Sequence, residues 1–591
     1  MNGFDMSSIF RLEWFAVLGF SVVVLLTTSG CPTSGENPEP VAPPEPVPVE
    51  SPAGGPIGPP TLPTVEFRQP PSLPASEPLP RPTREPVAEP LSPEPPVASN
   101  AEDFAAEKIV NVDKQVPPKP RTGKHSGIPF DPIQVNGPIF VDWPEPKLAL
   151  VITGMEEGYL EPCGCAGLDR MKGGMGRRHT LFKQLREKGW PVVGIDVGGL
   201  ARGFGRQAEM KFQTLAESKR KMGYDAIAFG ADDLRLPAGE LVAVAAGVED
   251  KPSPFVAANV GLFGFDAEIT PKSRVIEAGG MKIGVTAILG KQYQKEINNP
   301  DVEMSDPEAA LAAIVPELKQ KVDYLVLLAH ATRDESVALA KKFPEFDVVV
   351  TSDGPPEPPA APRTIEGTET LLITIGHKGM DVVVLALFDD ADQPLRYQRV
   401  PLDSRFPSSP DMKMLMTAYQ DQLKIIGFAG LGLRPVPHPQ WETNGRFVGS
   451  AKCESCHEES YNIWKKTGHG RAYDTLVKLD PPRNFDPECI SCHVIGWHPS
   501  KFFPYATGFE SKEKTPKLID TGCEDCHGPG AKHVAAELGS DETLQKALRK
   551  TMVITKAESE KQQCMSCHDI DNSPDFDFKS YWPLVEHYEE D

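Results

Sequence analysis

The sequence between residues 453 and 568 repeats Cys-x-x-Cys-His four times, as Cys453-Glu454-Ser455-Cys456-His457, Cys489-Ile490-Ser491-Cys492-His493, Cys523-Glu524-Asp525-Cys526-His527 and Cys564-Met565-Ser566-Cys567-His568. Two thiols at this spacing can each form a thioether with one vinyl group of a haem, and the adjacent histidine is then held below the iron. Paired cysteines also bind zinc in tetrahedral sites, but zinc does not explain a histidine after every pair. The motifs therefore predict four covalently attached c-type haems, with the proximal iron ligands His457, His493, His527 and His568.

The length and charge of the chain bound the rest of the interpretation. At 591 residues it exceeds a single domain. Its formal net charge is -22, from 61 Lys and Arg against 83 Asp and Glu. This charge argues against nucleic acid and anionic lipid surfaces as partners and favours a redox partner with a basic docking face. Eight of the 11 cysteines belong to the motifs, which leaves Cys31, Cys163 and Cys165 to explain.

The first 30 residues are predicted to be a signal peptide. The apolar run from Trp14 to Leu26 is too short to span a membrane comfortably and suits the core of an export signal. Thr27-Thr28-Ser29-Gly30-Cys31 resembles the bacterial lipoprotein cleavage box, although Thr28 replaces a larger aliphatic residue. We expect Cys31 to carry a lipid, with plain secretion as the alternative. Either fate places the protein outside the cytoplasm, in the periplasm or on the membrane surface.

Residues 31–125 are rich in proline, as in VAPPEPVPVESPAGGP, and show no apolar periodicity. Such a segment cannot bury enough surface to offset the entropy lost on ordering, so we expect a disordered, partly polyproline tether.

Residues 141–405 alternate apolar runs of strand length with helical patterns. LALVITG (148–154), VVGIDVG (192–198), AIAFG (226–230) and YLVLLAH (324–330) read as buried strands. HTLFKQLREKG, KFQTLAESKRK and PEAALAAIVPELKQK have apolar residues at helical spacing. The alternation predicts an α/β domain with helices covering the faces of its sheet.

The phrases GYLEPCGC, MGRRHTLFKQLR, GYDAIAFG, PFVAANV and MKIGVTAILG occur in this order. They resemble the metallophosphoesterase domain of the 5'-nucleotidase family, which implies a four-layer αββα sandwich. That family binds two metal ions. Five of the six matching ligand positions are changed or ambiguous, so we expect a degenerate relative without a dinuclear metal centre. The residues at these positions are Met155, Glu157, Gly198-Gly199, Gly230-Ala231-Asp232-Asp233, His330 and Ser352-Asp353-Gly354-Pro355.

Cys163-Gly164-Cys165 follows the first strand, close to where the metal cluster of that family would lie. With Gly173-Gly174 and Arg177-Arg178, it looks like a subgroup of exported nucleotidase-like proteins, which implies a redox role for the two cysteines. A disulfide across one residue closes a small strained ring, which favours a labile pair. An inert structural pair or a fragment of a metal site is the alternative.

Residues 406–448 read as a connector, and residues 449–591 as a mainly helical and irregular haem domain. The haem domain contains four further histidines that suit the second axial position of the irons, namely His469, His498, His533 and His587. Two histidines on one iron suit electron transfer, whereas an open position lets a small molecule bind.

The order of the motifs, with Thr467-Gly468-His469 after the first and Gly-Pro-Gly after the third, is similar to the tetrahaem cytochrome c-554 family. This resemblance implies that His469 binds the iron held by His527. It likewise pairs His533 with His457 and His587 with His568. It also implies a five-coordinate iron at His493. His498 lies five residues after His493 and is the weakest distal candidate, with a surface histidine as the alternative.

These observations support an exported, membrane-anchored cytochrome that carries electrons between redox partners. The resemblance implies a hydroxylamine oxidoreductase-like multihaem enzyme as one partner. The degenerate domain would dock a partner or exchange electrons through Cys163 and Cys165. One alternative is a multihaem oxidoreductase acting on a small nitrogen or sulfur compound, either at the His493 haem or at these cysteines. Another is a residual metallophosphoesterase. The sequence assigns no catalytic residue.

Overall fold

The computed structural model describes residues 130–163, 168–247, 252–266, 268–569, 571–573 and 576–587. The predicted signal peptide and tether, including Cys31, lie outside these residues, as does Cys165. Within the described part of the chain, every helix is too short or too polar to cross a bilayer.

The first sheet of the α/β domain has five strands in the order β13-β12-β1-β2-β3. The strands β1, β2 and β3 are parallel. Strand β12 pairs antiparallel with β1, and β13 pairs antiparallel with β12 at the edge of the sheet. The expected strand at 148–154 is confirmed as β1, and the strand expected at 192–198 as β2. The bounds are β1 Leu148–Thr153, β2 Val192–Asp196, β3 Tyr224–Ile227, β12 Asp381–Leu387 and β13 Leu395–Pro401.

The second sheet has six strands in the order β10-β11-β9-β8-β6-β5. Its central strands β11, β9, β8 and β6 are parallel, while β10 and β5 close the two edges antiparallel. The bounds are β5 Ser273–Ala278, β6 Met281–Leu289, β8 Tyr324–His330, β9 Val348–Thr351, β10 Arg363–Thr364 and β11 Leu371–Thr374. A separate ribbon pairs β4 (Val260–Leu262) with β7 (Val302–Met304).

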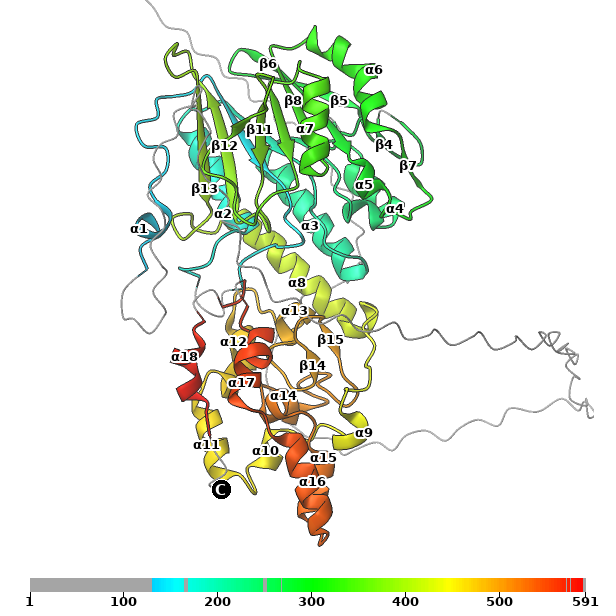
Figure 1. Ribbon diagram of the computed structural model, residues 1–591, viewed down its shortest axis with the longest axis vertical. Coiled ribbons are helices and arrows are strands. Elements are labelled where there is room, and N and C mark those ends of the chain that lie inside the picture. Colours follow the sequence, from blue (N-terminus) through cyan, green and yellow to red (C-terminus); the bar gives the residue numbers. More distant parts are fainter. Residues whose placement is uncertain are drawn as a thin grey trace, which may run out of the picture. The chain divides into compact units, whose positions relative to one another are not determined.

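Helices cover the outer face of each sheet (Figure 1). Alternate residues of β1 point to opposite sides, because successive side chains of a strand alternate. Leu148, Leu150 and Ile152 join an apolar cluster shared by both sheets, while Ala149 and Val151 pack with helices α2 and α3. A third cluster joins the second sheet to α6 and α7. The expected four-layer α/β sandwich is thereby confirmed. The helix bounds are α2 Met175–Glu187, α3 Arg206–Met222, α6 Pro307–Lys319 and α7 Arg333–Lys342. The shorter helices of this domain are α1 Pro132–Asn136, α4 Ala238–Ala245 and α5 Lys291–Gln294.

The segment expected to be a connector is mostly helix. Helix α8 (Pro410–Gly430) packs its first half against α2 and α3, with Met412, Met416, Tyr419 and Leu423 buried in the α/β core. The helix bends at Gly427, where a φ of 64° places the backbone in a region that favours glycine. Beyond the bend, the Phe428 ring packs on Trp497 of the haem domain, with ring centroids 4.7 Å apart. The expected connector therefore completes the α/β domain before it joins the haem domain.

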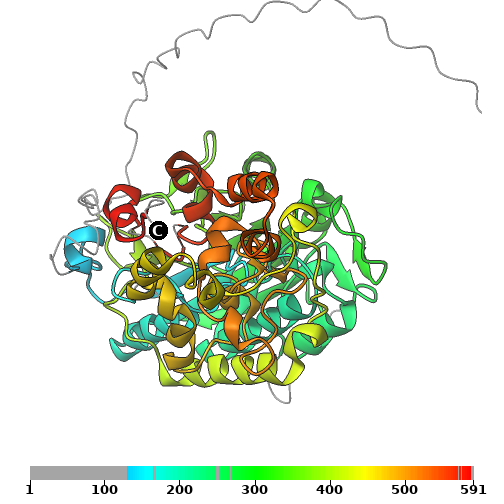
Figure 2. The same ribbon diagram turned by 90° about the horizontal axis from the view of Figure 1, so that it is seen from below.

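The haem domain consists of short helices joined by long loops (Figures 1 and 2). Its largest described apolar cluster has nine buried members, including Trp497, Ile490 and Phe509. The helices are α9 Trp441–Asn444, α10 Ser450–Cys453, α11 Glu458–Lys466, α12 Ala472–Lys478, α13 Pro487–Ile490, α14 Cys523–His527, α15 Ala531–Glu537, α16 Glu542–Met552, α17 Lys556–Glu558 and α18 Phe578–Tyr581. One small ribbon pairs β14 (Trp497–His498) with β15 (Phe503–Pro504).

Candidate haem-binding site

Each Cys-x-x-Cys-His motif forms a short helical turn. In the first and fourth motifs, the histidine N–H donates to the carbonyl of the first cysteine, at 2.9 Å for His457 and 2.9 Å for His568. The turn brings the two thiols and the imidazole of each motif close together, as attachment to one porphyrin requires. All eight motif cysteines are free thiols, so none is committed to a disulfide.

Three pairs of histidine rings face each other across gaps of similar size. The ring centroids lie 6.3 Å apart for His457 and His533, 6.0 Å for His469 and His568, and 5.9 Å for His527 and His587. A metal–nitrogen bond of about 2 Å on each side, with half a ring beyond each nitrogen, puts two axial imidazoles about 6 Å apart. The residues therefore fit three haem irons with two axial histidines each.

These pairs correct two of the expected partnerships. His533 faces His457, as the resemblance implied. His469, however, faces His568 rather than His527, and His587 faces His527 rather than His568. Spacing along the chain ties each proximal histidine to its own cysteines, but a distal histidine is placed by folding. The resemblance therefore chose histidines that do face motif histidines, but it exchanged the partners of two of them.

Hydrogen bonds orient the proximal histidines for ligation. Nδ1 of His493 lies 2.6 Å from the Ala472 carbonyl oxygen, and Nδ1 of His527 lies 2.6 Å from that of Met552. A ring that donates through Nδ1 presents a bare Nε2, which is the atom that binds a metal. Burial lowers the pKa of both histidines, which favours the neutral ring that a ligand must have.

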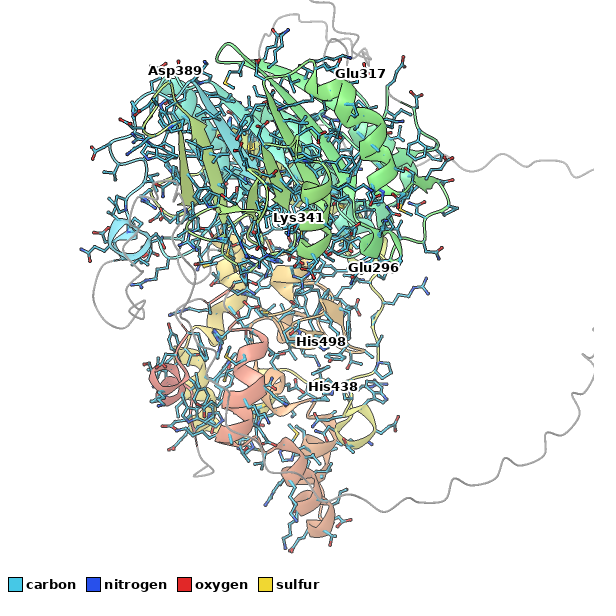
Figure 3. All side chains as sticks on the ribbon, turned by 45° about the horizontal axis from the view of Figure 1, so that its top comes forward. Glu296, Glu317, Lys341, Asp389, His438 and His498 are labelled. Carbon is cyan, nitrogen blue, oxygen red and sulfur yellow. The ribbon has the colours of Figure 1, made fainter. Side chains whose placement is uncertain are left out.

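His498 is turned away from this role. Its Nδ1 accepts a 3.3 Å hydrogen bond from the Ser500 N–H. Its ring packs against Phe503 and Tyr505, with centroids 5.1 Å and 6.2 Å apart. His438 contacts the same Tyr505 ring, and Figure 3 shows His438 and His498 near each other on the haem domain. This arrangement agrees with the surface-histidine alternative.

Motif cysteines from different motifs contact each other. A hydrogen bond between the side chains of Cys453 and Cys523 raises the pKa of Cys453 and lowers that of Cys523. A bond of the same kind links Cys492 and Cys567. The first motif thus lies beside the third, and the second beside the fourth.

The positions that match the metal ligands of the nucleotidase family are occupied by hydrogen bonds. Asp233 is buried and accepts from the N–H groups of Gly199, Gly230 and Ala201, at 3.0, 2.7 and 2.7 Å. Burial raises its pKa to about 6. His330 has Nδ1 3.1 Å from the Val197 carbonyl oxygen, and its Nε2 accepts from the Ala231 N–H at 3.2 Å. Burial lowers the pKa of His330 to about 4. Both ring nitrogens of His330 are therefore in use.

Glu157, at another of these positions, pairs with His377. Its carboxylate lies 2.5 Å from Nδ1 of His377, whose Nε2 is 3.2 Å from the Gly354 carbonyl oxygen. The hydrogen bond to Glu157 raises the pKa of His377. Among the described residues, no group of three or more His, Cys, Asp or Glu is arranged to hold a metal ion.

Sequence reasoning missed a buried ionic cluster beside these positions. Lys219 Nζ lies 2.5 Å from Asp196 and 2.7 Å from Glu156, and Arg178 lies 2.8 Å from Glu156. All four side chains have no exposed surface. Each charge is balanced by a partner, as buried charges require. The basic residues lie on α2 and α3 at positions that look like solvent-facing charges, so only the packed structure identifies the cluster.

Cys163 is disulfide-bonded, and its partner is not among the eight motif cysteines. Arg483 of the haem domain donates to the carbonyl oxygens of Pro162 and Cys163, at 3.0 and 3.3 Å. The loop that carries Cys163 therefore contacts the chain six residues before Cys489.

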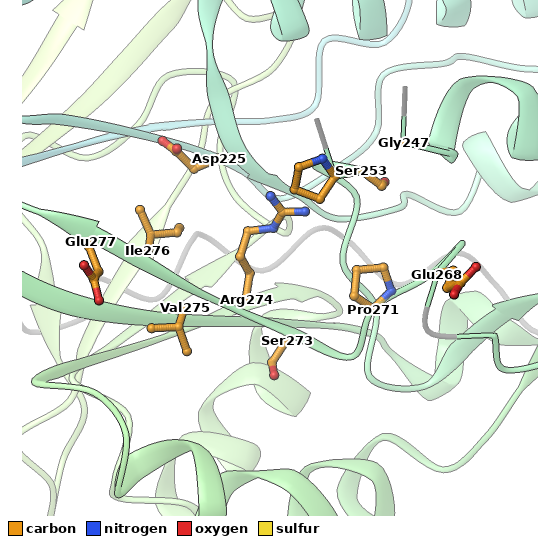
Figure 4. A pocket seen from close by; sticks show the side chains of 11 residues that line it. Asp225, Gly247, Ser253, Glu268, Pro271, Ser273, Arg274, Val275, Ile276 and Glu277 are labelled. Carbon is orange, nitrogen blue, oxygen red and sulfur yellow. The ribbon is translucent and has the colours of Figure 1, made fainter. Parts of the chain in front are cut away.

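A surface pocket of the α/β domain lies elsewhere. It is lined along edge strand β5 by residues that include Arg274 and Ile276, with Asp225 and Ser253 opposite (Figure 4). None of the predicted site residues lines it.

Comparison with known proteins places one likeness in the haem domain. Residues 452–528 match a family model described as "Cytochrome c554 and c-prime". The chain is similar to cytochrome c-554 from Nitrosomonas europaea, with 31% identity over 140 aligned residues, in a match that covers 21% of this chain and 57% of the relative. The chain thus spans a little over half of that relative. The predicted resemblance to cytochromes c-554 is confirmed, and c-type haem is the cofactor that it implies.

Solved structures are similar to the α/β domain. One is a 5'-nucleotidase precursor from Thermus thermophilus, with a TM-score of 0.40 and 21% identity, covering 47% of this chain and 59% of that one. Another is a sulfate thiohydrolase from Thermus thermophilus, with a TM-score of 0.40 and 13% identity, covering 48% and 62%.

Proposed function

We propose that the protein is an exported c-type cytochrome with four haems that carries electrons between redox partners. The observation that supports this most directly is the set of three facing histidine pairs at 5.9 to 6.3 Å. Two axial histidines keep an iron low-spin with little rearrangement on reduction, which suits a carrier. When bound, haem would supply the one-electron chemistry. The chain attaches it through eight cysteines and orients the axial rings through Nδ1 hydrogen bonds.

Two measurements on the mature protein test this. Its mass should exceed that of the polypeptide by four haems, and electron paramagnetic resonance should resolve three low-spin irons. A mass corresponding to fewer haems, or a majority of high-spin irons, would refute the tetrahaem carrier.

The exchanged histidine partners have their own test. His469→Ala should create a new high-spin iron in the intact protein. It should create none in a chain whose fourth motif carries Cys564→Ser and Cys567→Ser, because the iron facing His469 is then missing. A high-spin signal that persists in the second background would support the pairing with His527 instead.

A second candidate function is reaction of a small nitrogen or sulfur compound at the haem of the second motif. Supporting it is the position of His498, whose ring packs on Phe503 and Tyr505. This leaves the second axial position on the His493 iron to water or a substrate. Nitric oxide or cyanide should then shift the spectrum of one iron in four. If neither nitric oxide nor cyanide binds to any of the four irons, the second candidate function is refuted and only the electron carrier remains.

We also propose that Cys163 and Cys165 exchange electrons with the haem of the second motif. The contact of Arg483 with the Cys163 carbonyl supports this pairing. Two one-electron carriers in the ferrous state would together reduce one disulfide, with uptake of two protons. Replacing both cysteines by serine should abolish oxidation of the dithionite-reduced protein by an added small disulfide. If the rate of haem oxidation is unchanged, the two cysteines have a structural role only.

Partner and location follow from the charge and the N-terminus. An acidic protein favours a basic docking face on its partner, for which a hydroxylamine oxidoreductase-like multihaem enzyme is the candidate. Electron transfer to such an enzyme should slow as salt rises. Lipid attachment at Cys31 would hold the protein at a membrane, and Cys31→Ala should release it. Salt-independent transfer, or membrane retention of this variant, would count against these assignments.

A further inference from the structure

The segment just before the second motif is bound by side chains of the α/β domain. Lys211 on α3 forms an ion pair with Glu488, at 2.5 Å. Asp486 accepts hydrogen bonds from Gln207 on α3 at 3.0 Å and from Gln420 on α8 at 3.1 Å. Together with Arg483, these contacts bind residues 483–488 to three separate elements of the α/β domain.

These residues carry the attachment site directly. Asp486 is the N-terminal cap of α13, where its side chain accepts from the Glu488 N–H, and α13 contains Cys489. Asp486 and Lys211 are both buried, with 5% and 9% of their surface exposed. A buried charge acts over a longer range than an exposed one, because little water screens it. The helix that attaches this haem is therefore contacted by two buried charged side chains, Asp486 at its own N-terminus and Lys211 of the α/β domain, and Lys211 forms its ion pair with the partly exposed Glu488.

The segments before the first and fourth motifs are held differently. Before the first motif, the N–H groups of Val448 and Gly449 donate to Glu524. Before the fourth motif, Gln563 donates to the Asp525 carbonyl. Both partners belong to the haem domain. A cross-domain ion pair, Lys378 with Asp571, follows the fourth motif rather than preceding it.

We infer that the α/β domain sets the reduction potential of one particular haem, the one attached at Cys489 and Cys492, with Lys211 and Asp486 as its positioning residues. This inference rests on the proposed carrier function and adds which haem the α/β domain governs. The positive charge of Lys211 stabilises the added electron, and the negative charge of Asp486 opposes it.

The opposite charges allow a test that a loss of structure cannot imitate. In the full haem-loaded protein, Lys211→Met should lower, several-fold, the reduced fraction of one haem at a fixed potential. Asp486→Asn keeps an N-cap residue but removes the charge, and should raise that fraction. Loosening of the interface would instead move both variants in the same direction. Spectroscopic redox titration, resolved into its component haems, measures both.

Lys413→Met is the matched control. Lys413 also forms an ion pair across the domains, with Asp480, but both side chains are exposed. It should leave all potentials unchanged. Hydrogen exchange adds a second readout: residues 483–490 should exchange faster in Lys211→Met, while residues 447–453 should not.

Shifts of the same sign in the two variants, shifts spread over all haems, or none at all would overturn the inference. A wild-type protein whose haems cannot be reversibly reduced would instead refute the carrier function. The two failures are therefore distinguishable.

Discussion

The two domains differ in what fills their interiors. The α/β domain has three clusters of buried apolar side chains, which separate its four layers. In the haem domain, the largest cluster among the described residues has nine members, and most helices span fewer than ten residues. A core that small does not offset the entropy of ordering residues 449–591. The α/β domain is thus stabilised by its own side chains, whereas the haem domain needs bound haem to fill its interior.

Loss of haem attachment should give the largest difference in stability between the two domains. Serine at all eight motif cysteines should leave residues 449–591 open to proteolysis, because the macrocycles would no longer fill the interior. The α/β domain should keep its resistance. Limited proteolysis followed by mass spectrometry measures both in one sample. Equal protection of the two domains would mean that the haem domain has an adequate core of its own.

A cavity in the α/β core should have a large effect confined to that domain. Phe182 on α2 has no exposed surface and packs against Tyr224 with ring centroids 4.9 Å apart. Phe182→Ala should cost about 3–5 kcal/mol of unfolding free energy. Phe204, which is 85% exposed, provides the control, and Phe204→Ala should change stability by no more than about 0.5 kcal/mol. Denaturant unfolding gives both values, and the haem spectrum should be unchanged throughout.

Two buried groups at positions that match the metal ligands of the nucleotidase family should give opposite pH dependences. The pKa of Asp233 is raised to about 6, so its folded state binds the proton more tightly and stability falls as pH rises from about 4 to 6. The pKa of His330 is lowered to about 4, so its folded state binds the proton less tightly and stability rises over the same range. In the wild type the two slopes offset each other.

Single variants should expose each slope. Asp233→Asn should make the protein more stable at pH 6 than at pH 4, and His330→Gln should reverse that order, each by on the order of 3 kcal/mol. Thermal unfolding across this range measures the slopes, with the wild type as reference. Parallel slopes in the two variants would show that neither group dominates the titration.

The smallest effect should come from the exposed ion pair of Lys413 and Asp480. Solvent screens both charges, so Lys413→Met should change the unfolding free energy by about 0–1 kcal/mol. Lys211→Met, which leaves Glu488 without its ion-pair partner beside buried Asp486, should cost clearly more. Similar losses would indicate that burial does not distinguish the two contacts.

The sequence predicted the α/β architecture well because its strands are apolar on both faces. The run at 324–330 forms β8 with the predicted bounds, and the run at 148–154 forms β1 with one residue fewer. The strand expected at 226–230 begins instead at Tyr224 and ends at Ile227, before the segment that contains Asp233. Strand ends depend on neighbouring loops, which periodicity does not describe.

In the haem site, too, the sequence predicted the local features and missed those that depend on packing. Local spacing ties the proximal histidines to their cysteines, and in the structure three of them face a second histidine. The distal partners of His527 and His568 depend on how distant segments pack, and two were exchanged. The interface with the α/β domain was also missed, because Lys211 and Asp486 look like ordinary surface charges until α3 and α13 are seen together.

The bend in α8 also lies where the two domains meet. Before Gly427, the helix supplies several side chains to the α/β core; after it, Phe428 packs on Trp497, while Leu431 still belongs to the α/β core. The two domains therefore share the end of a single helix. A gene fragment cut at residue 405 would lose a wall of the α/β core, whereas one cut after Gly427 would keep it. The α/β domain therefore extends into the segment that the sequence predicts to be a connector.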